Sequence, residues 1–82
     1  MDRYNDILLE VNSVFHRVFN DNSLVILPET TADMISGWDS LSHMLLISEI
    51  EKQFDFEFDF SEVMGFQNVG DMIMTILNKT AT

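Results

Sequence analysis

The most informative segment is Gly37-Trp38-Asp39-Ser40-Leu41-Ser42-His43, where a loop containing glycine meets the start of a helical pattern. The pattern that follows predicts a helix from about Asp39-Ser40 to Phe54. Its apolar residues cover more of the helix circumference than a single core-facing stripe requires. They are Leu41, Met44, Leu45, Leu46, Ile47 and Ile50.

This helix is therefore expected to have two apolar faces. One face is assigned to the core and comprises Leu46, Ile47, Ile50 and Phe54. The other is assigned to a surface beside Ser40 and comprises Leu41, Met44 and Leu45. A small bundle can also bury most of such a helix, and the pattern alone does not distinguish the two interpretations.

The segments before this helix predict one further helix and a long loop. Apolar residues recur at helical spacing from Tyr4 to Phe19, so we expect a first helix there. The run Asn20-Asp21-Asn22-Ser23 ends it, and the stretch to Trp38 has no sustained period. Loops of this length in compact domains are usually functional or partly structured. The apolar run Leu24-Val25-Ile26-Leu27 is expected to pin the loop across the helices.

The segments after this helix predict a short helical turn and a final helix. Residues 55–60 alternate acids and phenylalanines, which could indicate a strand, but a strand would find no partner in this chain. We expect the phenylalanines to fill gaps between helices. A helical turn from Asp59 to Met64 and a last helix capped by Asn68 complete the pattern. The prediction is an all-α bundle of three to four helices, one domain spanning residues 1–82.

Composition excludes several classes of function. The chain has no cysteine, so thiolate metal sites and cysteine nucleophiles are absent. Its formal net charge is -10 and no lysine or arginine occurs in residues 18–51, which disfavours nucleic acid and anionic membrane as partners. A protein with a basic docking patch is the expected partner, although acidity can also serve solubility alone. Without a leader or a membrane span, a cytoplasmic monomer is expected.

Ser40 is the candidate functional residue. A serine at a helix start is most often only an N-cap. However, Asp39-Ser40-Leu41, followed by an amphipathic helix ending in Glu49-Ile50-Glu51-Lys52-Gln53-Phe54, resembles the acyl carrier protein family. The order of the helices, the chain length and the acidity fit the same family. The resemblance implies a protein that is not an enzyme and whose Ser40 covalently carries 4'-phosphopantetheine, transferred from coenzyme A, with an acyl cargo held as a thioester.

The resemblance also implies partners and a docking surface. The partners would be a phosphopantetheinyl transferase and the acyl-activating or acyl-transferring enzymes of a lipid, polyketide or other specialised biosynthetic pathway. The docking residues would be Asp39, Leu41, Met44, Leu45 and Glu51. Fatty-acid carriers commonly have an acid five residues after the modified serine and a run of acids near the end of this helix, where this chain has Leu45 and Glu51-Lys52. Docking to a general fatty-acid synthase is therefore not expected.

Two other functions remain open, namely an aminoacyl or peptidyl carrier and a helical adaptor that is not modified. Other sites are excluded. Gly37-Trp38-Asp39-Ser40-Leu41 only superficially matches a serine-esterase signature, and His43 has no evident orienting acid. A calcium loop starting at Asp55 would have phenylalanine at its glycine and glutamate positions. No ligand set for zinc is present, and no metal is expected.

Overall fold

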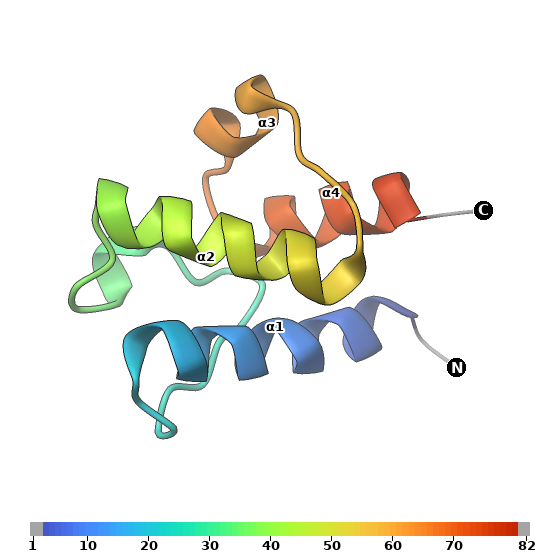
Figure 1. Ribbon diagram of the computed structural model, residues 1–82. Coiled ribbons are helices and arrows are strands. Elements are labelled where there is room, and N and C mark those ends of the chain that lie inside the picture. Colours follow the sequence, from blue (N-terminus) through green and yellow to red (C-terminus); the bar gives the residue numbers. More distant parts are fainter. Residues whose placement is uncertain (1–2, 81–82) are drawn as a thin grey trace.

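The expected all-α fold is confirmed by the computed structural model, which describes residues 3–80. Its α-helices are α1 (Arg3–Phe19), α2 (Ser40–Phe54), α3 (Phe60–Gly65) and α4 (Val69–Thr80), with a short 3-10 helix, η1 (Ala32–Met34), in the first loop. No strand occurs between residues 3 and 80, so the alternation in residues 55–60 does not form one. Helix α1 packs against α2 and α4 and runs opposite to both, while α3 lies on the other side of α2 (Figure 1).

The core lies where α1, α2 and α4 meet. Each helix contributes an apolar stripe at helical spacing, as the sequence predicts. On α2, Leu46, Ile47 and Ile50 are buried and Phe54 is half-buried. The predicted exposed face, Leu41, Met44 and Leu45, is exposed. The prediction that α2 has one buried and one exposed apolar face is therefore confirmed. The buried apolar residues of the described chain are Ile7, Val11, Val14, Phe15, Ile26, Leu46, Ile47, Ile50, Phe58, Val63, Val69, Met72, Ile73 and Ile76.

Polar contacts fix the long loop between α1 and α2. The Asn12 side chain of α1 accepts a hydrogen bond from the Ile26 N–H at 2.8 Å and donates to the Ile26 carbonyl at 3.0 Å. Two residues further along the loop, the Pro28 carbonyl accepts from the Gly70 N–H at 2.7 Å. A Cβ at Gly70 would lie only 3.2 Å from this carbonyl, so glycine permits the close approach. The loop is thereby held against the middle of α1 and the start of α4.

The expectation that Leu24-Val25-Ile26-Leu27 pins the loop is only partly right. Ile26 is buried and Leu24 packs on the core, but Val25 is 76% exposed and Leu27 46% exposed. The Asn12 side chain binds both backbone groups of Ile26 and so holds this residue against α1. Side chains alternate along an extended chain, so Leu24 shares the inner side with Ile26, whereas Val25 and Leu27 are exposed.

The segment between α2 and α3 also corrects one expectation. Asp55 adopts a left-handed conformation and ends α2. Phe58 is buried and Phe56 half-buried, as expected, but Phe60 is 75% exposed. The reason is that Phe60 is the first residue of α3 and no longer belongs to the extended segment.

Side-chain contacts anchor α3 and α4. The Glu62 carboxylate accepts from the Asp59 N–H at 2.8 Å, and Lys79 of α4 binds the carboxylates of Asp59 and Glu62, each at 3.1 Å. Asn68 caps α4, as predicted, by accepting from the Asp71 N–H at 2.9 Å. Among the described residues, no helix has both the length and the apolar character needed to cross a bilayer.

Candidate functional site

A network of short contacts shapes the start of α2. Gly37 has a φ of 86°, a conformation that glycine adopts readily and other residues rarely do. The Asp39 carboxylate accepts from the Ser42 N–H at 2.9 Å, and Ser42 Oγ accepts from the Asp39 N–H at 2.8 Å. Ser42 Oγ also donates to the Gly37 carbonyl at 2.8 Å. Asp39 is thus the N-cap of α2, and Ser42 completes the reciprocal cap.

Ser40 takes no part in this cap. It is the first residue of α2 and its side chain is exposed. Within residues 3–80, its hydroxyl has no hydrogen-bond partner. The ordinary explanation of a serine at this position, helix capping, therefore applies to Ser42 and not to Ser40. A chemically accessible hydroxyl is left at the positive end of a helix of 15 residues.

The carboxylate beside Ser40 is held in its ionised form. Hydrogen bonds from the Ser42 backbone N–H and then from the Ser42 hydroxyl lower the pKa of Asp39 below its ordinary value of 3.8. Asp39 is consequently a fixed negative charge immediately before Ser40 at neutral pH.

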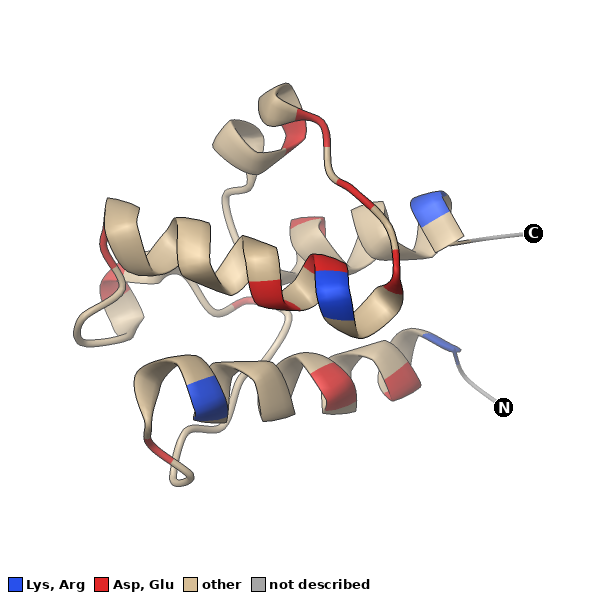
Figure 2. Cartoon of the chain, in the orientation of Figure 1, with Lys and Arg blue, Asp and Glu red and all other residues tan. Residues whose placement is uncertain are grey.

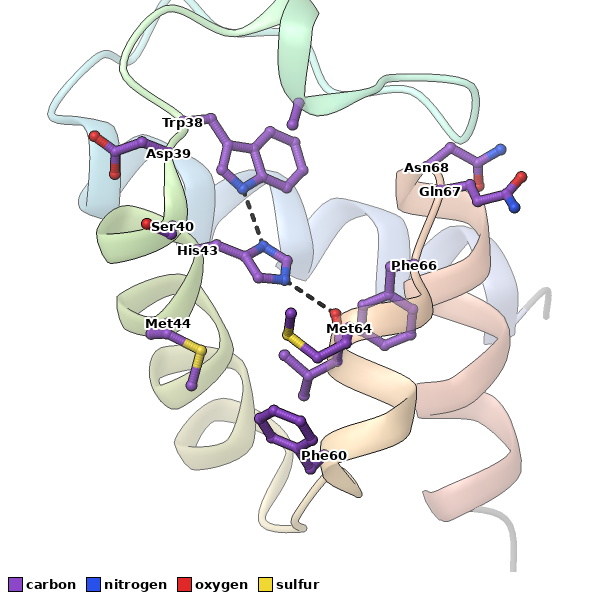
Figure 3. A pocket seen from close by; sticks show the side chains of 12 residues that line it. Trp38, Asp39, Ser40, His43, Met44, Phe60, Met64, Phe66, Gln67 and Asn68 are labelled. Carbon is purple, nitrogen blue, oxygen red and sulfur yellow. Dashed lines mark hydrogen bonds between the residues drawn. The ribbon is translucent and has the colours of Figure 1, made fainter.

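An open apolar groove of about 620 Å³ begins at Ser40 and runs between α2 and α3 (Figure 3). Met44 from α2 and Phe60 and Met64 from α3 line its outer part. Asp39 is the one lining residue with a carboxylate. The complete lining is Ala32, Trp38, Asp39, Ser40, His43, Met44, Phe60, Val63, Met64, Phe66, Gln67 and Asn68.

A hydrogen-bonded bridge crosses the floor of this groove (Figure 3). The Trp38 Nε1–H donates to His43 Nδ1 at 3.0 Å, and His43 Nε2 lies 3.2 Å from the Val63 carbonyl of α3. Because indole N–H groups only donate and carbonyls only accept, both contacts are hydrogen bonds in the His43 tautomer that carries its proton on Nε2. His43 is half-buried. Its partners were not predicted, because Val63 lies 20 residues away in the sequence.

The five predicted docking residues are not equivalent in the structure. Leu41, Met44 and Leu45 are 81%, 49% and 52% exposed and lie on the same helix as Ser40. Asp39 belongs to the cap, and the Glu51 carboxylate accepts from the Phe58 N–H at 2.8 Å, which ties α2 to the following loop. The first half of α2 carries no charged side chain after Asp39, whereas acids gather near its end (Figure 2).

A comparison with known protein families shows the family to which this chain belongs. Residues 11–76 match the family model described as phosphopantetheine attachment site. The chain belongs to this family. Members are carriers that bear the phosphopantetheine group and perform no catalysis themselves, so this chain is a phosphopantetheine-bearing carrier protein.

A solved structure supports the same assignment. The solution NMR structure of holo acyl carrier protein from Geobacter metallireducens matches with a TM-score of 0.85 and 39% sequence identity. The match covers 90% of this chain and 85% of that one. No curated protein sequence matches this chain significantly.

The residues at the start of α2 fit the carrier group. Phosphopantetheine supplies a thiol at the end of a long arm, and its phosphate needs a hydroxyl for attachment. Ser40 offers an exposed hydroxyl without an internal partner, and the adjoining groove is open and largely apolar. The dipole of α2 also favours an anionic group at this end. Among the described residues, no cluster of three or more histidines and acids could hold a metal ion.

Proposed function

We propose that this carrier protein holds an acyl cargo as a thioester on 4'-phosphopantetheine attached to Ser40. The observation that carries the proposal is the contrast between two serines on the same helical turn. Ser42 Oγ is committed to the α2 cap, whereas the Ser40 hydroxyl is exposed and unbonded within the described chain. The protein itself would act as one domain and as a cytoplasmic monomer.

The attachment requires an external enzyme. A phosphopantetheinyl transferase would join Ser40 Oγ to the pantetheine phosphate of coenzyme A. The pyrophosphate bond breaks, adenosine 3',5'-bisphosphate leaves, and the serine proton passes to a base on the transferase. The fixed geometry of Asp39 and Ser42 supports this role, because it holds the start of α2 in place while leaving the Ser40 hydroxyl free.

Partner enzymes would recognise the surface around Ser40. Leu41, Met44 and Leu45 present exposed apolar side chains, and large apolar groups at a surface favour protein contacts. We propose that these residues dock acyl-activating and acyl-transferring enzymes of a lipid, polyketide or other specialised pathway. Asp39 and Glu51 would add charge at the two ends of this face, toward a basic patch on the partner.

These observations also bear on the two other candidate functions, an unmodified adaptor and an aminoacyl or peptidyl carrier. Membership of the phosphopantetheine attachment family favours a carrier over an unmodified adaptor. An aminoacyl or peptidyl carrier would share the fold and the attachment. The largely apolar groove favours an acyl cargo, since it offers a charged ammonium group no carboxylate partner other than Asp39.

The proposal is tested by loading the protein and then releasing the cargo. Purified protein is treated with coenzyme A, magnesium and a broad-specificity transferase, and then with an acyl-activating enzyme and a medium-chain fatty acid. Two successive mass increases are expected, and neutral hydroxylamine should remove only the second because it cleaves thioesters. A cargo that resists hydroxylamine, or that loads equally onto Ser40→Ala, would contradict the proposal.

A further inference from the structure

Two of the four basic residues of the chain lie beside the exposed apolar face of α2. Arg17 of α1 and Lys52 of α2 approach the Glu49 carboxylate, with N–O separations of 3.9 and 3.5 Å (Figure 2). The other two, Arg3 and Lys79, bind side chains elsewhere in the fold. Two cations therefore share one carboxylate, so this cluster has one positive charge in excess on a chain whose net charge is -10.

The acids that flank this cluster do not neutralise it by direct contact. Glu10, Glu51 and Asp21 each accept a hydrogen bond from another group, at 3.0, 2.8 and 2.9 Å, and Asp55 is exposed. Within residues 3–80, none of these four acids forms an ion pair with the two cations. Exposed charges separated by more than about 8 Å are largely screened at physiological ionic strength. The excess charge of the cluster therefore acts on a group in direct contact with it, even though the chain as a whole is acidic.

Both cations have donors available to a further partner. The Arg17 and Lys52 side chains are 51% and 74% exposed. The Arg17–Glu49 separation exceeds hydrogen-bond length, and within residues 3–80 the guanidinium donates to no other group. Exposed ion pairs of this kind are weak. A carboxylate from another molecule can therefore bind Arg17 and Lys52 in place of Glu49.

A small hollow between α1 and α2 adjoins the cluster. Its volume is about 230 Å³, several times the roughly 30 Å³ that a water molecule occupies in the liquid, so a side chain can enter it. It is lined by Arg17, Val18, Leu45 and Glu49. Leu45 is 52% exposed and lies one helical turn from Leu41, which is 81% exposed. The hollow thus continues the exposed apolar face that begins beside Ser40.

We propose that a partner protein of this carrier inserts an apolar side chain into the α1–α2 hollow and places a carboxylate against Arg17 and Lys52. The inference rests on the proposed docking at α2 and deepens it by adding an acidic group to the partner's basic patch. Lys52 lies about 18 Å from Ser40 along α2, at roughly 1.5 Å per residue, so this contact selects partners away from the attachment site. A partner with basic groups alone would place like charges against both cations and is disfavoured.

A protein is the occupant that the charges favour. An anionic membrane and a second copy of this chain would each bring many negative charges against a surface whose net charge is -10. A protein can present one acid beside one apolar side chain and carry basic groups elsewhere. This arrangement matches the carboxylate of Asp39 at one end of α2 and the cationic cluster toward the other.

Two designed peptides test this surface. Both are about 18 residues long, enough to hold a helix, and have a leucine face; one has a single flanking glutamate where the other has glutamine. Each is titrated into the 15N-labelled protein and followed by NMR. The glutamate peptide is expected to shift the signals of Val18, Leu45 and the Arg17 side chain, and to bind about 2- to 30-fold more tightly, the range that two exposed ion pairs give. The net charge of the chain alone would give the opposite order, so equal affinities, tighter binding of the glutamine peptide or no shift at these residues would overturn the inference.

Matched variants assign the preference to the cluster. Arg17→Gln combined with Lys52→Gln should abolish the preference for glutamate, whereas Arg3→Gln, which removes a cation elsewhere, should leave it unchanged. Glu49→Gln should increase the preference because it removes the competing carboxylate, and Glu57→Gln, an exposed acid outside the cluster, should not. Circular dichroism checks that each variant is folded. A preference that survives the double substitution, or that Arg3→Gln reduces equally, would contradict the inference.

The other two occupants are tested with the same signals. The labelled protein is mixed with vesicles of phosphatidylcholine and phosphatidylglycerol, and is separately measured over a range of its own concentration. Shifts at Val18 and Leu45 that appear in either series, but not with the glutamate peptide, would assign the hollow to a membrane or to a second copy and overturn the inference. These titrations need no modification of Ser40, and the mass of the transferase-treated protein reports attachment separately. The two proposals can therefore fail independently.

Discussion

Replacing Ser42 by alanine should destabilise the protein without preventing modification, and replacing Ser40 should do the reverse. Ser42 Oγ accepts from the Asp39 N–H and donates to the Gly37 carbonyl, each at 2.8 Å. Two net hydrogen bonds contribute about 0.5–1.5 kcal/mol each, and the higher helix propensity of alanine returns roughly 0.5 kcal/mol. The expected loss for Ser42→Ala is therefore about 0.5–2.5 kcal/mol. For Ser40→Ala, which removes no internal contact, the change should stay within about 0.5 kcal/mol.

Urea unfolding followed by circular dichroism measures both variants against the unaltered protein. A loss of 1 kcal/mol lowers the melting temperature of a domain of this size by roughly 4–8 °C, so thermal unfolding gives an independent check. Mass spectrometry after treatment with the transferase then reports modification. The reasoning fails if Ser42→Ala is as stable as the unaltered protein, or if Ser40→Ala loses as much stability as Ser42→Ala.

Three further perturbations test other parts of the structure. Ile50→Ala leaves a cavity in the fully buried core and should cost about 2–5 kcal/mol in urea unfolding; a smaller cost would place Ile50 outside the packed core. Hydrogen bonds from Ser42 lower the pKa of Asp39, so the ionised carboxylate stabilises the fold fully at pH values above its ordinary pKa of 3.8. This stabilisation is lost as the pH falls through the pKa of Asp39 in the folded protein, because protonation weakens the hydrogen bonds from Ser42. Thermal unfolding between about pH 5 and 3 should show a shallower decline for Asp39→Asn than for the unaltered protein, and parallel curves would refute this assignment. Hydrogen bonds from Lys79 to Asp59, and then to Glu62, raise the pKa of Lys79 above its ordinary value of 10.5. The charged Lys79 side chain therefore stabilises the fold fully at pH values below 10.5, and this stabilisation is lost as the pH rises through the pKa of Lys79 in the folded protein. Lys79→Met should accelerate amide exchange in α3 at neutral pH while leaving α1 unchanged, and equal exchange rates in α3 would contradict the anchoring role.

Local patterns in the sequence were sufficient to predict the helices. Apolar spacing located α1, α2 and α4 to within a few residues, because each helix buries one stripe against the others. The cap of α4 was also predictable, since Asn68 acts on an N–H only three residues ahead. The excess of apolar residues on α2 predicted that some of them stay exposed, and Leu41 is indeed 81% exposed.

Contacts between distant segments could not be predicted in the same way. Val25 and Leu27 have the same apolar character as Ile26, and only the backbone contacts of Asn12, 14 residues away, determine which side chain turns inward. The bridge from His43 to Val63 likewise spans 20 residues and depends on how α3 is placed. The cap of α2 was ambiguous because Asp39, Ser40 and Ser42 are all residue types that cap helices.

The most direct test of the central proposal is intact-protein mass spectrometry of the unaltered chain after incubation with coenzyme A, magnesium and a broad-specificity phosphopantetheinyl transferase. Peptide mapping then locates the addition. We predict a gain of one phosphopantetheinyl group, on the peptide that contains Ser40 and on that residue alone. An unchanged mass with several such transferases, or an addition at any other residue, would contradict the proposal.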